Sequence, residues 1–371
     1  MKLIYNLILF IISLFLFSCN KPNSQENETI IASKSENLET LNLSTYFADI
    51  KIIPLSNKVM IGEIERLVVD AKNNIYILDS HLSGTISKFN FKGDLVNYIR
   101  IENDSRFDLN GIMDMYFDYP YLNLNVLGNR IVKLDTNLNV IERINLPYNS
   151  NSHIKLRDKY LMFNNFLEDK ILYDYYVYDD KKNKISNEFL KIDNDYPFHY
   201  KANTVFQSNN GFYFFSKAFN DTIYEIDEFL NLKPYITVDF GSYKIQKRSL
   251  EKISNAMEMI QFLRQPDFNT LMGEIHFVKD TVLISTVHSE GKTKNILINT
   301  YSKEATIFSQ YKDDLISGAK FQNILYSDER YLVFSLSSEL LYDQLVDTIS
   351  NFKEDSNLTP NQNPYLFIIE K

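Results

Sequence analysis

The fold is decided by residues 64–101, which read IERLVVDAKNNIYILDSHLSGTISKFNFKGDLVNYIRI. Four short runs rich in Ile, Val, Leu, Phe and Tyr follow one another, and clusters such as Asn73-Asn74 and Lys92-Gly93-Asp94 separate them. Runs of this composition, bounded by Asn, Asp and Gly, are typical of β-strands joined by turns. The stretch therefore predicts four consecutive strands.

The same layout recurs along the chain. Residues 112–146 read IMDMYFDYPYLNLNVLGNRIVKLDTNLNVIERINL, and similar units can be drawn over 152–193, 202–241, 273–314 and from 319 to the end. A period of about 40 residues with four strands per unit is typical of propeller blades. We therefore expect an all-β fold over residues 44–371, a six-bladed β-propeller with four-stranded blades. The alternatives, a pair of β-sandwiches or a β-helix, fit such a unit less well.

The two ends of the predicted propeller complement each other. The last unit has strand-like runs only at about 321–326, 331–337 and 364–371, one fewer than a blade needs. Residues 46–55, YFADIKIIPL, form a spare strand at the other end. We predict that this N-terminal strand closes the last blade, because closure leaves no open sheet edge in the ring.

One segment departs from the β pattern. Between residues 247 and 264, Leu250, Ile253, Met257, Ile260 and Leu263 recur near helical spacing, which predicts a helix of about four turns inserted between blades 4 and 5. It would cover a blade edge, or form a lid or a docking surface. The polar residues 338–363 are expected to form a surface loop.

The N-terminus has the features of a lipoprotein signal. Residues 1–18 combine Lys2 with an apolar run too short to span a membrane comfortably, and residues 16–19, LFSC, resemble a lipobox. We predict lipidation of Cys19, anchoring to a lipid bilayer, and a flexible tether over residues 19–43. The alternative is an uncleaved helical anchor. Asn20, in place of an aspartate, favours the outer membrane of the cell envelope; the side that the protein faces stays open.

Residues 50–101 also carry a family resemblance. An entry strand with Ile53-Pro54-Leu55, a turn at residues 61–64 (IGEI), a strand at residues 74–79 (NIYILD) and the Phe-x-x-x-Gly-Asp turn at residues 89–94 occur in this order. The segment resembles the six-bladed β-propeller lipoproteins of Gram-negative bacteria, a group related to NHL-repeat propellers. The resemblance implies fold and location but no activity. Residues 102–111 depart from the Gly- and Pro-rich turn usual in the group.

Composition and motifs exclude several function classes. A net charge of −9 argues against nucleic acid, which binds through clustered Lys and Arg. Cys19 is the only cysteine, so thiol catalysis elsewhere is excluded, and the five histidines lack metalloprotease spacing. Residues 193–195 (DND) resemble the opening of a calcium loop, but the following Tyr196-Pro197 favours a plain turn. We predict no catalytic residue and no cofactor.

A possible divalent cation in the central channel is the remaining chemical hypothesis. Polar residues fall in the runs expected to be innermost, and strand periodicity puts Glu274 and His276 on one face. These candidates are Glu65, Asp114, Gln207, Glu274, His276 and Asn323. Oxygen ligands converging there would support a lactonase-like, metal-dependent hydrolase.

Binding is the favoured function. The sequence has 25 Tyr and 27 Phe residues that could stack on sugars, although Trp is absent. We therefore expect a binding or scaffold module for a protein or glycan partner, with the hydrolase as the alternative.

Overall fold

The computed structural model describes residues 28–32, 38–101, 111–164, 172–192, 206–345 and 363–371. The predicted signal sequence, Cys19, the calcium-like residues 193–195 and nearly all of the loop at 102–111 lie outside the described residues.

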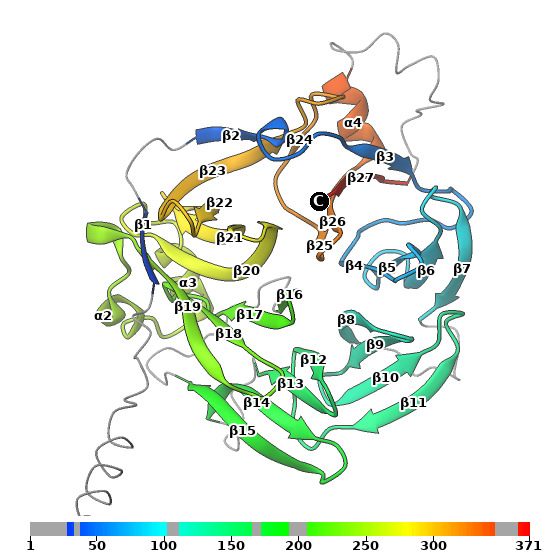
Figure 1. Cartoon of the computed structure of the whole chain (residues 1–371), viewed down its shortest axis with the longest axis horizontal. Helices are drawn as coiled ribbons and strands as arrows, with labels where there is room; N and C mark the ends of the chain where they lie inside the picture. Colours follow the sequence, from blue (N-terminus) through cyan, green and yellow to red (C-terminus); the bar gives the residue numbers. More distant parts are fainter. Residues whose placement is uncertain (1–27, 33–37, 102–110, 165–171, 193–205, 346–362) are drawn as a thin grey trace, which may run out of the picture.

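Six antiparallel blades of four strands each form a ring (Figure 1), which confirms the predicted six-bladed propeller. Blade 1 contains β4 (Arg66–Val69), β5 (Ile75–Asp79), β6 (Thr85–Phe89) and β7 (Leu95–Arg100); blade 2 contains β8 (Ile112–Asp118), β9 (Tyr121–Val126), β10 (Arg130–Leu134) and β11 (Val140–Asn145). Blade 3 contains β12 (Ser152–Leu156), β13 (Lys159–Phe163), β14 (Tyr173–Asp179) and β15 (Lys184–Lys191); blade 4 contains β16 (Gln207–Asn209), β17 (Phe212–Ser216), β18 (Thr222–Ile226) and β19 (Leu232–Asp239). Blade 5 contains β20 (Thr270–Lys279), β21 (Val282–Ser289), β22 (Lys292–Asn299) and β23 (Glu304–Lys312); β24 (Lys320–Phe321) pairs with β23. Blade 6 contains β25 (Tyr326–Ser327), β26 (Tyr331–Leu336), β27 (Tyr365–Glu370) and β3 (Lys51–Pro54).

The N-terminal strand closes blade 6, as predicted. β3 pairs antiparallel with β27, with Ile53 opposite Leu366. The turn of the Phe-x-x-x-Gly-Asp motif lies against the end of this strand, where Ser56 N donates to the Gly93 carbonyl at 2.9 Å. Gly93 has a φ of +86°, and a Cβ there would collide with the carbonyl oxygen of Pro54. The glycine thus permits a tight contact between blades 6 and 1.

The predicted tether over residues 19–43 is wrong for residues 28–32 and 38–42, which form strands. β1 (Glu28–Ala32) runs parallel to both β19 and β23, and β2 (Leu38–Asn42) runs parallel to β23. β1 thus joins blades 4 and 5, and with β2 and β24 added at β23 they form one 11-stranded sheet. Ile30 is fully buried among residues of both blades. Docking on two sheet edges gives this short segment the order that its polar composition did not predict.

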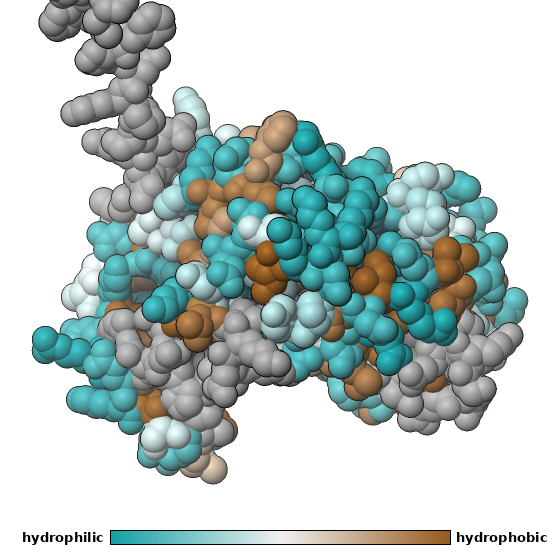
Figure 2. Space-filling model, turned by 90° about the horizontal axis from the view of Figure 1, so that it is seen from below, coloured by the Kyte–Doolittle hydropathy of each residue, from teal (hydrophilic) through white to brown (hydrophobic). Residues whose placement is uncertain are grey.

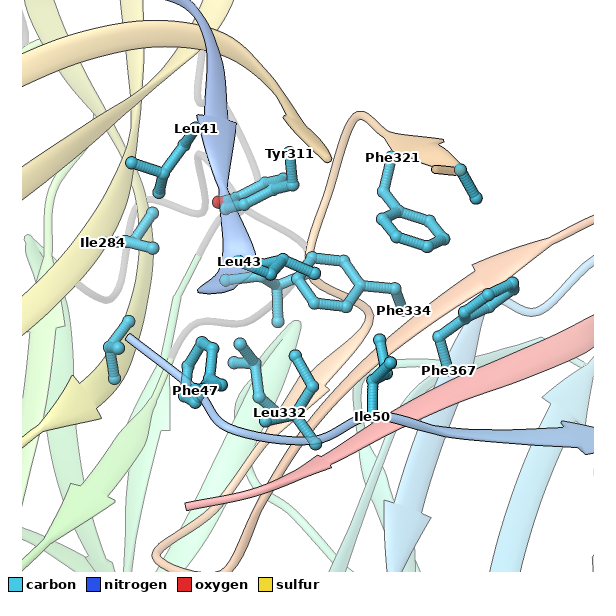
Figure 3. Packing of buried hydrophobic residues seen from close by; sticks show 14 of the residues in the cluster. Leu41, Leu43, Phe47, Ile50, Ile284, Tyr311, Phe321, Leu332, Phe334 and Phe367 are labelled. Atoms are coloured by element: carbon cyan, nitrogen blue, oxygen red, sulfur yellow. The ribbon is translucent and has the colours of Figure 1, made fainter. Parts of the chain in front are cut away.

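The chain from β2 to β3 is also part of the core. Leu41, Leu43, Phe47 and Ile50 pack against side chains of blades 5 and 6 (Figure 3). The blade 5 and 6 contacts in this cluster include Ile284, Tyr311, Phe321, Leu332, Phe334 and Phe367. The N-terminal segment therefore seals the junction where the ring closes.

The helical insertion lies between blades 4 and 5 as predicted, but it is two short helices instead of one. α2 (Lys247–Leu250) and α3 (Ala256–Phe262) are separated because Asn255 caps α3: its side chain accepts from Glu258 N, and the Glu258 carboxylate accepts from Ser254 N at 2.7 Å. This reciprocal capping starts a new helix. The predicted loop at 338–363 begins instead with α4 (Ser338–Leu345).

Candidate functional site

The innermost strands surround an open central cavity of about 1230 Å³. Blades 1, 2, 3, 4 and 6 line it mainly with their inner strands, whereas blade 5 contributes Gln310 of its outer strand β23. The residues of β24 and, from α4, Leu340 and Gln344 add to the lining. The cavity is larger than most small-molecule sites, which are roughly 300–1,000 Å³. Its position and size make it the candidate functional site.

A polar network ties the inner strands of blades 1, 2 and 3. Arg66 Nε donates to Asp114 Oδ1 at 2.9 Å, and Ser152 Oγ donates to Asp114 Oδ2. The paired Arg66 and Asp114 side chains are only 15% and 12% exposed. Such little-exposed charges are stable only when paired, so Asp114 holds the three blades in register.

A second network ties blades 4, 5 and 6. Ser327 Oγ donates to Gln207 Oε1 at 2.8 Å and lies 2.9 Å from His276 Nδ1. The Ser327 hydroxyl proton is donated to Gln207, so in the contact with His276 the Nδ1–H group is the donor and the Ser327 oxygen accepts. The other ring nitrogen, Nε2, is then a buried acceptor without a partner among the described residues. Burial lowers the pKa of His276 to about 3, so the ring is neutral at neutral pH.

Blades 2 and 3 bury a second neutral histidine beside the cavity. The His153 ring packs edge-on against Tyr116, with ring centroids 4.9 Å apart, and burial lowers the His153 pKa to about 4. Neither ring nitrogen of His153 nor the Tyr116 hydroxyl has a hydrogen-bond partner among the described residues. These groups add uncharged polarity to the cavity wall.

The proposed metal ligands do not converge. Glu65, Asp114 and Asn323 line the cavity, whereas Glu274 and His276 are absent from its lining. His276 contacts blade 6 through Ser327, and Glu274 accepts a hydrogen bond from Thr286 Oγ1 at 2.6 Å. The face that strand alternation gives to both residues is thus not among the residues that line the cavity.

The two predicted carboxylates that line the cavity, Glu65 and Asp114, are already engaged. Glu65 Oε1 accepts from the backbone N–H groups of Ser80 and His81, each at 2.7 Å, and Asp114 binds Arg66 and Ser152. Within the described ranges, no three His, Cys, Asp or Glu side chains are grouped closely enough to hold a metal ion. This donor set does not fit a divalent cation.

Two further ion pairs line the cavity, and exposed amides stand beside them. Lys155 Nζ lies 3.1 Å from Asp118, and Arg330 lies 2.9 Å from Asp328. Arg66, Ser152 and Ser327 were not predicted as site residues, although each stands in or beside a strand that the repeat places innermost. Two adjacent cavity-lining residues, Gln322 and Asn323, are exposed. Their amides offer donors and acceptors to a ligand.

Comparison with protein families identifies the chain. The family model described as "Domain of unknown function (DUF4934)" matches residues 28–370. The chain belongs to the DUF4934 family. The match begins at Glu28, the first residue of β1, so the bridging strand is part of the family's unit. No curated protein matches this DUF4934 chain.

Solved structures share the DUF4934 chain's fold at low sequence identity. A protein from Bacteroides fragilis that is assigned as exported has a TM-score of 0.71 and 15% identity, over 92% of this chain and 99% of that one. A member of the DUF4221 family from Bacteroides vulgatus has a TM-score of 0.52 and 12% identity, over 88% and 97% of the two chains. At such identities the likeness establishes the fold alone. Among the described residues, no helix is long and apolar enough to cross a membrane.

Proposed function

We propose that this DUF4934 protein is a lipid-anchored binding module of the cell envelope, whose central cavity receives part of a protein or glycan partner. The observation that carries the proposal is the construction of the cavity. Two polar networks fix its wall, and exposed amides stand at Gln322 and Asn323. A rigid wall with free donors and acceptors favours binding, because little ordering is required when the ligand arrives.

Binding is favoured over metal-dependent hydrolysis by the state of the carboxylates. Glu65 and Asp114 spend their oxygens on protein donors, so a cation would have to displace formed hydrogen bonds. The lipobox-like residues 16–19 support the anchor at Cys19 and an outer-membrane location. The exported assignment of the Bacteroides fragilis protein agrees with an envelope location.

Site-specific photo-crosslinking tests the cavity. A crosslinking residue replaces Gln322 at the cavity or Val96 on β7, which is 53% exposed on the outer strand of blade 1. In cells that make the full chain, we expect an adduct from position 322 and none from position 96. Equal labelling at both positions, or none at 322, would contradict the proposal.

Two further measurements separate the parts of the proposal. Cys19→Ala should move the protein from the membrane fraction to the soluble fraction, because the acyl chains provide the anchor. Chelation of divalent ions should leave the position-322 adduct unchanged. A lactone-hydrolysing activity that chelation abolishes, and that Asp114→Asn removes, would support the hydrolase instead.

A further inference from the structure

Helix α3 exposes apolar side chains on the side opposite its packed face. Met259 and Phe262 are buried against Leu250, Ile253 and Phe268. Met257 and Ile260, three residues apart and therefore on one face, are 62% and 46% exposed. A surface helix usually presents polar residues to water, so this outward pair marks a contact surface.

The charge around this pair differs from the rest of the chain. Residues 244–267 contain five Lys or Arg and three Asp or Glu residues, a net charge of +2 in a chain of −9. Arg248, Lys252 and Arg264 are exposed. Figure 2 views the ring from below the orientation of Figure 1. On this side, hydrophobic residues form small separate groups among hydrophilic ones. Exposed apolar residues beside basic ones fit an anionic lipid surface.

The anchor enters the propeller beside this insertion. β1 begins at Glu28, which pairs with Ile236 of β19, and the insertion starts directly after the end of β19 at Asp239. Ile236 and Asp239 are three residues apart on β19, which corresponds to about 10 Å along the strand. Nine chain steps separate Cys19 from Glu28, a reach of at most about 30 Å. A lipid on Cys19 would therefore hold the junction of blades 4 and 5 close to the bilayer.

The arrangement of the ring agrees with this. In Figure 1, β1, α2 and α3 lie on one side of the ring and β7 lies on the opposite side. The part of the ring nearest the anchor is thus the part with the exposed apolar pair and the basic side chains.

We propose that the insertion at residues 244–267 is a membrane-contact element. Met257 and Ile260 enter the interfacial layer of the bilayer, while Arg248, Lys252 and Arg264 meet anionic head groups. The inference rests on the lipid anchor of the proposed function and adds an orientation: the propeller stands with its blade 4–5 rim on the membrane, and the cavity mouths open sideways. A single contact of this size is weak alone and becomes effective beside a covalent anchor.

The test uses the lipidated full chain in vesicles of phosphatidylethanolamine with about one quarter phosphatidylglycerol. An environment-sensitive fluorophore is attached to a cysteine introduced at Met257 or Ile260, with Val96 as the control of similar exposure on blade 1. We expect a blue shift and quenching by spin-labelled lipid at positions 257 and 260, and neither at 96. Arg248→Glu with Lys252→Glu should reduce both signals.

Each outcome is decisive. Water-like emission at 257 and 260 in a chain that remains membrane-bound overturns the inference and leaves the proposed function standing. A chain that does not sediment with membranes refutes the anchor. Shielding of position 257 in native envelopes but not in lipid vesicles would identify a protein as the occupant and also overturn the inference.

Discussion

Replacing Ile30 by Ala tests whether β1 is an integral part of the propeller. Ile30 is fully buried in a cluster with Val238 and Phe240 on one side and Ala305 on the other. The change removes three carbon atoms, worth about 0.8 kcal/mol each in transfer, and leaves a cavity, for a total of about 2–5 kcal/mol. The substitution keeps every backbone group that pairs β1 with β19 and β23, so the loss originates in side-chain packing.

Two measurements are needed because β1 is short. Urea denaturation measures the global free energy of unfolding, and amide hydrogen exchange at Ile30 and Ile31 measures local release of the strand. If the strand releases before the ring unfolds, the global loss stops at the docking free energy of β1 and exchange accelerates instead. Ile30→Val, which should cost about 0.5–1.5 kcal/mol, is the matched control. Unchanged urea midpoint and unchanged exchange in Ile30→Ala would refute the bridging role.

Three further predictions concern the site and the turns. Asp114→Asn should lower the free energy of unfolding by about 1–3 kcal/mol in urea, since Arg66 and Ser152 lose a charged acceptor, whereas Asp118→Asn, whose ion pair is one-third exposed, should cost less than about 1 kcal/mol. Because burial lowers the folded-state pKa values of His153 and His276 to about 4 and about 3, the unfolded chain binds more protons below its own histidine pKa of about 6.5. Stability should therefore be fully present above that pH and fall on acidification towards pH 4, by at most about 1.4 kcal/mol per pH unit for each histidine, and His276→Gln should reduce this slope in urea titrations at a series of pH values. Asp135→Ala should cost about 1 kcal/mol by the same assay, because the carboxylate accepts from two backbone N–H groups and a side-chain amide in the β10–β11 turn; no change would show that the turn forms without it.

The repeat predicted the architecture because each blade is a local unit. Each repeat of about 40 residues contains the residues that determine its strands, its turns and its apolar faces. The same turn chemistry recurs from one repeat to another. Asp70, Asp135 and Asp227 each accept from the backbone N–H two residues on and from an asparagine four residues on. This repeated turn was a signal in the sequence that the strand pattern alone did not use.

What the sequence missed depends on distant partners. The apolar centre of β1 is only Ile30-Ile31, too short to stand out in a polar segment, and its pairing residues lie more than 200 positions away. The break between α2 and α3 could have been predicted from the sequence, because Asn255 followed by Glu258 is a capping pattern. The spacing also placed Met257 and Ile260 among the packed positions, yet both are exposed, because α3 turns Met259 and Phe262 inward.

The sequence predicted where the candidate site lies, but only some of the residues that line it. Glu65, Asp114 and Asn323 do line the cavity, whereas His276 contacts blade 6 and Glu274 bonds to Thr286 within blade 5. Strand periodicity assigns a side chain to one of two faces, but it does not say which face meets the channel. The pairing of Arg66 with Asp114 joins two blades and could not be derived from a single repeat.

The pairing of β3 with β27 also sets the order in which the protein is completed. Lys51 lies opposite Ile368, so β3, which is synthesised early, can pair with β27 only after β27 has been synthesised. Contacts between such distant residues slow folding, and until they form, β3 and β26 each present an unpaired edge. The newly made chain is therefore an open arc that is exposed to proteases and to other chains, and it becomes a ring only when residues 365–370 arrive.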